Sequence, residues 1–236
     1  MKLNEQCLLG IEGSGFSISV GLVVSGVPRG LIYLNDGSPG SESLLATIDQ
    51  LLTMLRVDRQ ELEGICVTMG PGSFTSLRIS LAVAESLGLG LDIPVYGVDT
   101  LQLMAGTVPF YPGQIKVIQN AYKGEFYTAS YSTKEGRPQL LDSLRLVKPE
   151  SFYHRLENND LLLGSGVQEL LKKGFDLAAK SVRWDQQFQR LATGIAVVEH
   201  FLESEARPPS VKPLEPIYIR LSEAEINYEK QFGSEP

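Results

Sequence analysis

A glycine-rich stretch in the first half of the chain, Gly70-Pro71-Gly72-Ser73-Phe74-Thr75-Ser76-Leu77-Arg78, constrains the fold more than any other segment. A short apolar run, 65–69, precedes it, and a long apolar run, 77–91, follows it. This pattern predicts a tight loop between a buried strand and the start of a helix. In α/β proteins the ligand-binding or catalytic residues usually lie at such a corner.

The loop has two interpretations. Ser73 and Thr75 offer oxygens to the unpaired amides of the first helical turn, and a helix N-terminus attracts anions. The candidate nucleotide-binding residues are therefore Gly70, Gly72, Ser73 and Thr75. Equally, the glycines make the turn, Ser73 caps the helix and nothing binds.

Two known phosphate motifs are excluded in this loop. A Walker A loop needs a Lys followed by Ser or Thr, and the loop has no Lys. A dinucleotide-binding fingerprint needs a third glycine, and Thr75 stands in its place.

Composition limits the class of protein. The chain has 236 residues, 43% hydrophobic and 21% charged, as expected of one large or two small globular domains. Its net charge of −7 argues against a basic surface that holds nucleic acid unaided, so we expect any contact with RNA to be indirect. The N-terminus does not resemble a secretory signal, and we expect no segment that approaches the length of a membrane span. We therefore expect a cytoplasmic protein without a membrane segment.

The few cysteines and histidines argue against metal chemistry. Cys7 and Cys66 lie in apolar, strand-like runs, which suits reduced and buried thiols. His154 and His200 have no ligand-type neighbours at metal-binding spacing. We expect no metal site.

Residues 7–34 read as two or three antiparallel strands joined by tight turns. The turn at Glu12-Gly13-Ser14-Gly15 is either a plain hairpin turn or a phosphate-facing loop with a carboxylate at its base. A helix with one broad apolar face follows from Ser43 to Leu55.

The helix after the glycine-rich loop is apolar nearly all round, so we expect it to be buried on more than one side. One side must be its own sheet, and the other a neighbouring helix or another protein. Internal helices are more common, which favours a core helix.

The first half closes with a strand at 93–98 and a short helix capped by Asp99-Thr100. A boundary follows at 106–113, which predicts domains 1–106 and 107–236. The second half repeats the order of strands before helices. Beyond the boundary we expect a hairpin at 115–131, a strand at 138–148 and a short helix at 149–159. A buried strand ending in a glycine-rich turn at 161–166 and a helix at 168–173 follow. Then come an amphipathic helix at 186–205, which packs back towards the first lobe, and an extended tail at 213–221.

Several of these motifs together resemble the TsaB (YeaZ) family. The glycine-rich loop and the following Leu77-Arg78-Ile79 look like its signature, together with Ile93-Pro94-x-x-Gly97-Val98-x-Thr100-Leu101. The hairpin 121–127 and the closing Pro216-Ile217-Tyr218-Ile219-Arg220 are similar to further family motifs, so the resemblance spans most of the chain.

This resemblance implies a two-lobed α/β fold of the actin, sugar-kinase and Hsp70 group, which is ribonuclease H-like. It also implies a non-catalytic scaffold subunit in the bacterial machinery that makes N6-threonylcarbamoyladenosine at tRNA position 37. Such a subunit forms a homodimer or pairs with the catalytic subunit TsaD, which holds the metal, and the ATPase TsaE joins the pair.

The helices of the first lobe are then the expected partner surface. Its candidate residues are Leu44, Ile48, Arg78, Leu81, Ala82 and Glu85. No cofactor is expected on this chain alone, and ATP or ADP is expected, if at all, at the interface with the partner.

Three departures from the family pattern weaken a claim to ATP binding. The first turn has Glu12-Gly13-Ser14 where Asp-Thr-Ser is common, no histidine precedes Ser41-Glu42, and Asn120 replaces the usual hairpin Asp. Two alternatives stay open: a nucleotide-dependent phosphotransferase of the same fold, and, with less support, a peptidase using Ser73 or Ser76.

Overall fold

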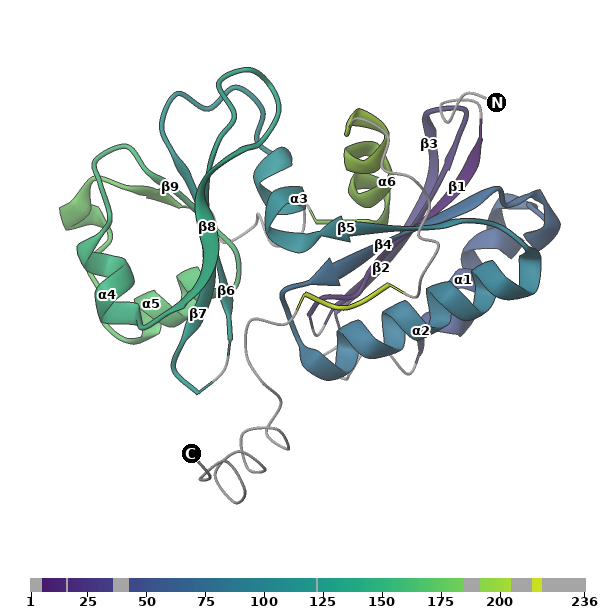
Figure 1. Ribbon diagram of the computed structural model, residues 1–236, viewed down its shortest axis with the longest axis horizontal. Coiled ribbons are helices and arrows are strands. Elements are labelled where there is room, and N and C mark those ends of the chain that lie inside the picture. Colours follow the sequence, from purple (N-terminus) through teal and green to yellow (C-terminus); the bar gives the residue numbers. More distant parts are fainter. Residues whose placement is uncertain are drawn as a thin grey trace, which may run out of the picture.

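A computed structural model describes residues 6–15, 17–35, 43–121, 123–184, 192–204 and 214–217. They form two α/β lobes side by side, each built on a five-stranded sheet (Figure 1). The predicted α/β fold with two lobes is confirmed.

The first sheet begins with an antiparallel meander of β1 (Cys7–Glu12), β2 (Ile18–Val24) and β3 (Val27–Leu34). On the other side of β1, β4 (Gly64–Gly70) and β5 (Val95–Asp99) are added in parallel. The strand order is therefore β3-β2-β1-β4-β5. All residues of β1 are buried, as expected for a central strand covered on both faces.

The second sheet repeats this plan. The meander consists of β6 (Ile115–Asn120), β7 (Phe126–Ser132) and β8 (Gln139–Val147). The parallel strands are β9 (Leu161–Leu163) and β10 (Arg183–Trp184). Counted within each lobe, both sheets have the order third, second, first, fourth, fifth. This duplicated plan agrees with the fold that the resemblance implied.

Helices cover both faces of the first sheet (Figure 1). On one face, α1 (Leu44–Leu55) and α2 (Phe74–Leu91) enclose an apolar cluster. On the other face lie α3 (Thr100–Gly106) and α6 (Gly194–Glu203), and α6 contacts β1 and β2. Part of the helix predicted over 186–205 lies outside the described residues, and the described part packs on the first lobe.

One apolar cluster is shared by the two lobes. Leu8 and Tyr96 of the first sheet, Val117 and Tyr131 of the second, and Phe201 of α6 all belong to it. Tyr96 and Phe201 stack with ring centroids 4.2 Å apart. The helices α4 (Pro149–His154) and α5 (Gly166–Lys172) close a separate cluster on the far side of the second sheet. Short 3₁₀ turns occur at Arg59–Glu61 and Ala178–Lys180.

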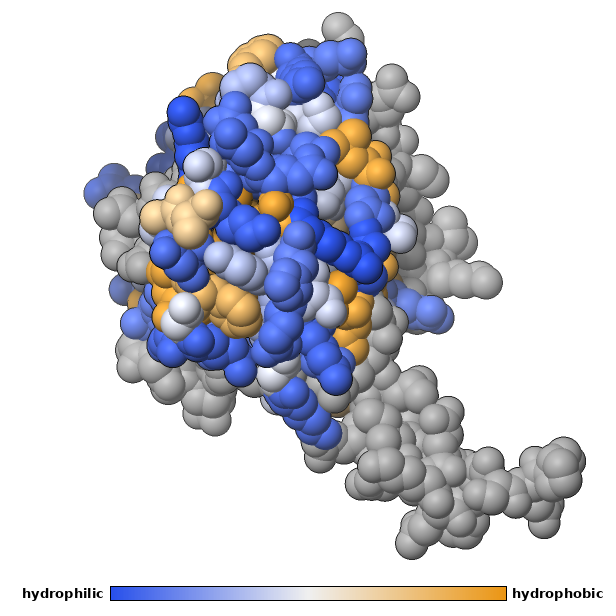
Figure 2. All heavy atoms as spheres, turned by 90° about the vertical axis from the view of Figure 1, so that its left-hand side faces the viewer, coloured by the Kyte–Doolittle hydropathy of each residue, from blue (hydrophilic) through white to orange (hydrophobic). Residues whose placement is uncertain are grey.

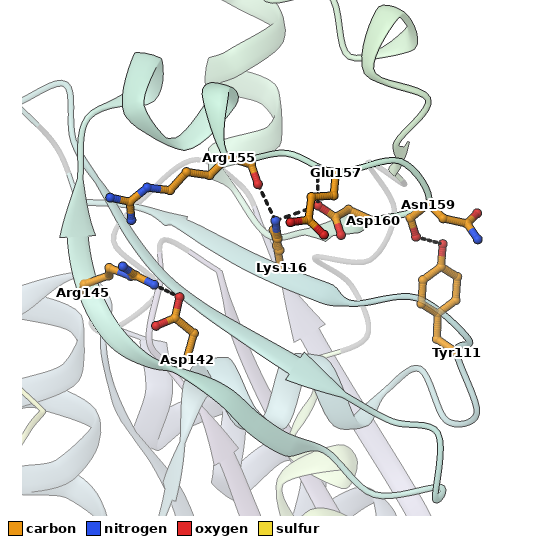
Figure 3. A network of polar contacts seen from close by, with 8 residues as sticks. All are labelled: Tyr111, Lys116, Asp142, Arg145, Arg155, Glu157, Asn159 and Asp160. Carbon is orange, nitrogen blue, oxygen red and sulfur yellow. Dashed lines mark hydrogen bonds and ion pairs between the residues drawn. The ribbon is translucent and has the colours of Figure 1, made fainter.

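A buried ion pair ties β6 to the connection between α4 and β9 (Figure 3). The Nζ of Lys116 lies 2.7 Å from Oδ2 of Asp160 and donates to the carbonyl oxygen of Arg155 at 2.7 Å. The same carboxylate oxygen accepts the backbone N–H of Glu157 at 2.8 Å. Buried charges are tolerated only with partners that replace their hydration, and this network supplies them.

Candidate functional site

A cleft of about 420 Å³ opens between the two lobes. Its first wall comes from the turn after β1 and the loop before α2, and its second wall from the end of β6 and the turn before α5. The described residues that line it are Glu12, Ser14, Gly15, Ser17, Tyr33, Asn35, Gly72, Ser73, Met104, Gln119, Asn120, Ser165, Gln168, Glu169 and Ala192. The topology thus brings together the glycine turns at 13–15, 70–72 and 164–166.

Glu12 is folded over its own turn. Its carboxylate oxygen accepts the backbone N–H of Ser14 at 3.0 Å and also the Ser14 hydroxyl. The residue is only 4% exposed, and burial raises the pKa of its carboxyl above the ordinary value, while the bonds from Ser14 act in the opposite direction. A carboxylate in this place takes the N–H group and hydroxyl that a bound phosphate would otherwise accept.

The loop before α2 packs directly against this turn. The Ser73 N–H donates to the carbonyl oxygen of Ser14 at 2.7 Å, and a Cβ at Gly72 would lie 2.1 Å from that same oxygen. Gly70 has a φ of +103°, a conformation that favours glycine. The glycines are therefore needed for the close approach of the two loops. This approach also engages the Ser73 N–H in a hydrogen bond within the chain.

Ser73 is the N-cap of α2, as predicted. Its hydroxyl oxygen accepts the N–H of Ser76 at 3.4 Å and the Ser76 hydroxyl at 3.0 Å. Among the described residues no histidine bonds to either serine, so the peptidase alternative gains no support from the geometry. Thr75 does not cap the helix: it is an exposed residue inside the first turn.

The four candidate nucleotide-binding residues therefore separate. Gly72 and Ser73 line the cleft, whereas Gly70 packs against Leu77 and Thr75 is an exposed residue that is not part of the lining.

The second wall of the cleft is a small amide and hydroxyl network. The Ser165 hydroxyl donates to Oε1 of Gln119 at 2.6 Å, and the Asn120 N–H donates to Oγ of Ser165 at 2.9 Å. Sequence reasoning noted the glycine-rich turn after residue 163 but missed Gln119 and Gln168. At the end of β6, sequence reasoning had singled out only Asn120, as a departure from the family pattern. Side chains at the end of a strand carry no local signal of what faces them, so Gln119 could not be found from the sequence.

The cleft does not fit the polyphosphate of a nucleotide. Among its described lining residues there is no Lys, Arg or His, and the carboxyl groups are those of Glu12 and Glu169. Phosphate sites usually combine free backbone N–H groups with a cation, and here the N–H groups of Gly13, Ser14 and Ser73 are bonded within the chain. Within the described part of the chain, no group of three or more His, Cys, Asp and Glu side chains is placed to hold a metal ion.

The cysteines are buried free thiols, as predicted. Burial raises the pKa of Cys7 to about 11, with the carboxylates of Glu61 and Glu63 adding to the effect. Burial alone raises the pKa of Cys66. Neither is among the residues that line the cleft.

The outer side of α2 is a second candidate site. The helix carries only two charged residues, Arg78 and Glu85, and it buries six of its eighteen residues against the sheet and α1. The helix thus contacts its own sheet and the neighbouring helix α1, as predicted, and part of its surface stays exposed in the single chain. The exposed residues on its outer side are Phe74, Thr75, Arg78, Ala82, Ser86, Leu89 and Gly90.

This outer side contrasts with the end of the second lobe, where most residues are hydrophilic and the hydrophobic ones form separate small groups (Figure 2). On α2, Leu89 is 87% exposed, and the guanidinium carbon of Arg78 lies 3.9 Å from the ring centroid of Phe74. That contact places the flat face of a cation beside exposed apolar surface, an arrangement that is common at protein interfaces.

Half of the predicted partner residues are misplaced. Leu44, Ile48 and Leu81 are buried in the core cluster beneath α1 and α2, so no partner reaches them in this conformation. The error arises because the periodicity of an amphipathic helix marks the face that packs on its own sheet. Arg78, Ala82 and Glu85 lie on the accessible part of α2.

The expectation about membrane-span length is also corrected. By length and composition α2 is long and apolar enough to cross a membrane. One such helix is weak support for a span, because core helices pass the same test, and α2 lies with its inner side on the sheet.

The family model for TsaD, tRNA N6-adenosine threonylcarbamoyltransferase, matches residues 40–201. This match covers more than half of the chain. The chain belongs to this family. Within it, the predicted likeness to the TsaB (YeaZ) proteins is confirmed. The TsaB protein of Bacillus subtilis, named a tRNA threonylcarbamoyladenosine biosynthesis protein, is 27% identical over 94% of this chain and 97% of its own length.

Solved structures of YeaZ type share the fold of this threonylcarbamoyltransferase-family chain. YeaZ from Pseudomonas aeruginosa has a TM-score of 0.67 and 22% identity, over 83% of this chain and 90% of its own. A protein described as similar to the peptidase YeaZ from the same organism has a TM-score of 0.70 and 21% identity, over 91% and 100%. Both support a fold of two lobes along nearly the whole chain.

Proposed function

We propose that this chain is a non-catalytic subunit required to form N6-threonylcarbamoyladenosine at tRNA position 37. In this role it docks on a TsaD-type catalytic subunit through the outer side of α2, and a TsaE-type ATPase joins the pair. Membership of the threonylcarbamoyltransferase family supports a part in tRNA threonylcarbamoyladenosine biosynthesis. The cleft supports the non-catalytic assignment, since its lining does not suit a polyphosphate.

The exposed side of α2 is the observation that carries the proposal. An 18-residue helix is about 27 Å long, at about 1.5 Å per residue. Along this length the outer side offers small and apolar residues such as Ala82 and Leu89, with few charges to desolvate. Depletion of charge at the centre is what distinguishes an interface from ordinary surface. The same side also suits a second copy of the chain, so we propose a homodimer in the absence of the partner.

The remaining parts of the proposal follow from charge. With a net charge of −7, the chain is poorly suited to bind the tRNA backbone by itself, so tRNA contacts are assigned to the partner. If ATP or ADP binds near this subunit, it does so at the junction with the partner, where the partner supplies the cations that the described lining of the cleft does not provide.

The experiment is a pull-down and titration with the TsaD-type subunit, using Ala82→Arg in the full-length chain. Because Ala82 is exposed, the variant should keep its thermal midpoint, whereas a large charged side chain at the centre of an interface should weaken binding by about a hundredfold or more. Ser151→Arg, also on an exposed helix position but on α4, is the matched control and should bind normally.

Reconstituted tRNA modification should fall with binding, and light scattering should show the wild type as a dimer and Ala82→Arg as a monomer. Normal partner binding by folded Ala82→Arg would refute the docking surface. Modification that proceeds without this chain would refute the requirement for the subunit.

A further inference from the structure

A C-terminal segment, Leu214–Ile217, lies alongside α2 and the end of β4 (Figure 1, yellow). The N–H of Leu214 donates to Oε1 of Glu85 on α2 at 2.5 Å. The N–H of Ile217 donates to the carbonyl oxygen of Met69 on β4 at 2.8 Å. Each end of the segment is thus hydrogen-bonded to a residue more than a hundred positions earlier in the sequence.

The segment is also packed against the first lobe. Leu214 contacts the core cluster that contains Leu81 and Ala84 of α2. At the other end, the carbonyl oxygen of Ile217 lies 3.4 Å from the position of a Cβ at Gly70. Of the four residues only Glu215 is fully exposed, so the segment has one side on the lobe and one side towards solvent.

Glu85 connects the segment to the outer side of α2. On a helix, residues three and four apart are neighbours, so Glu85 adjoins both Ala82 and Leu89. One oxygen of its half-buried carboxylate is held by the Leu214 N–H. The exposed side of the segment is therefore continuous with the exposed side of α2.

The size of a stable interface requires such an extension. A specific complex buries about 800 Å² on each partner, whereas the outer side of a helix about 27 Å long and about 10 Å wide has a footprint of roughly 270 Å². A partner centred on α2 must also cover what lies beside it. On one side this is α1, and on the side of Glu85 it is the segment 214–217.

We propose that Leu214–Ile217 and the outer side of α2 form one docking surface for the TsaD-type subunit, in which Glu85 positions the segment. This inference rests on the proposed function and deepens it. The segment is part of the surface that the partner covers, and it stays in place when the partner binds. A segment that blocked the surface would have to be displaced, which would expose Leu214 and its apolar contacts to water.

Two pairs of variants in the full-length chain test this inference by titration with the TsaD-type subunit. Glu85→Ala removes the acceptor for the Leu214 N–H, whereas Glu85→Gln retains an oxygen there. Ile217→Pro removes the donor to Met69, whereas Ile217→Val retains it. Loss of the positioned segment should weaken binding about tenfold or more. The two retaining variants should bind within about twofold of the wild type, because Gln keeps an oxygen acceptor for the Leu214 N–H and Val keeps the N–H that donates to Met69.

Thermal melting separates docking from mere structural support. If the segment only covers the lobe, Glu85→Ala and Ile217→Pro lower the thermal midpoint but leave the affinity of the folded protein unchanged, and the inference fails. Tighter binding by either variant identifies a blocking segment and overturns it. Weaker binding by Glu85→Ala alone shows that Glu85 contacts the partner directly, which also overturns it.

Ala82→Arg distinguishes failure of this inference from failure of the proposed function. When Ala82→Arg abolishes binding and the segment variants do not, α2 is the docking surface and the segment is not part of it. When Ala82→Arg binds normally, the docking surface itself is wrong.

Discussion

At the scale of single residues, Glu12 shows how one side chain can occupy the hydrogen-bond donors of a turn that lines the cleft. It sits in the turn that joins β1 to β2, with one carboxylate oxygen bonded to the N–H and hydroxyl of Ser14. The turn lines the cleft, and its carboxylate takes two of the donors that a phosphate would need. The carboxyl faces the cleft, yet it is almost fully buried.

Glu12→Gln should raise stability at neutral pH. Burial raises the pKa of the Glu12 carboxyl in the folded state, so the folded chain binds more protons than the unfolded chain above the ordinary Glu value of about 4.3. The contribution of this group is therefore most favourable below that pH and is lost as pH rises through the folded-state pKa. Gln keeps an oxygen for the Ser14 N–H and carries no charge.

Denaturant unfolding at a series of pH values checks this prediction. The wild type should lose stability relative to Glu12→Gln as pH increases from about 4.3, and the two should converge below it. A wild type that gains stability over the variant in that range would contradict it. Ser151→Ala, an exposed change far from the cleft, provides the control.

At the scale of elements, the contact of α6 with the first sheet depends on glycine. A Cβ at Gly10 would lie 1.8 Å from the carbonyl oxygen of Gly194, and one at Gly21 would lie 2.4 Å from the N–H nitrogen of Ile195. The Gly194 N–H also donates to Oγ of Ser19 at 3.1 Å. The start of α6 therefore rests directly on the backbone of β1 and β2. This contact joins the end of the described chain to its beginning.

Gly21→Ala should destabilise the fold by about 1–3 kcal/mol or more, because the added methyl meets backbone atoms that cannot rotate away. Gly15→Ala is the matched control, since a Cβ there has no heavy atom within 4 Å. Chemical denaturation measures both. Equal stability of the two variants would show that α6 can shift at little cost.

At the scale of the whole molecule, two sheets of the same order enclose a cleft whose described lining contains no Lys, Arg or His. The shared apolar cluster fixes the lobes against each other through α3 and α6. The described lining of the cleft offers carboxylates, amides and hydroxyls. This lining disfavours the phosphotransferase alternative, which a nucleotide titration tests.

The chain alone should therefore give no saturable heat when titrated with Mg-ATP at about millimolar concentration, which corresponds to a binding free energy weaker than roughly −4 kcal/mol. The TsaE-type ATPase under the same conditions is the positive control. Saturable binding to the isolated chain, lost in Ser73→Ala, would restore the phosphotransferase alternative. Heat that appears only with the TsaD-type subunit present would place the nucleotide at the junction.

The sequence by itself determined most of the elements. Alternation, glycine turns and capping residues marked the meander, the strand before the glycine-rich loop, and the starts of α2 at Ser73 and α3 at Asp99, because these signals are local. The family motifs added the two-lobed fold. The domain boundary near residue 106 and the cytoplasmic location remain predictions.

Only the tertiary structure decided which surfaces are available. Leu81 and Ala82 are adjacent in an apolar run, yet one is in the core and the other faces solvent, because the angle at which α2 lies on the sheet is set by distant strands. The same holds for Gln119 of β6 and Ser165 of the turn before α5, which meet in the cleft wall, and for Leu214, which reaches Glu85. Side-chain environment is a property of the packed chain, so residue type and spacing alone cannot supply it.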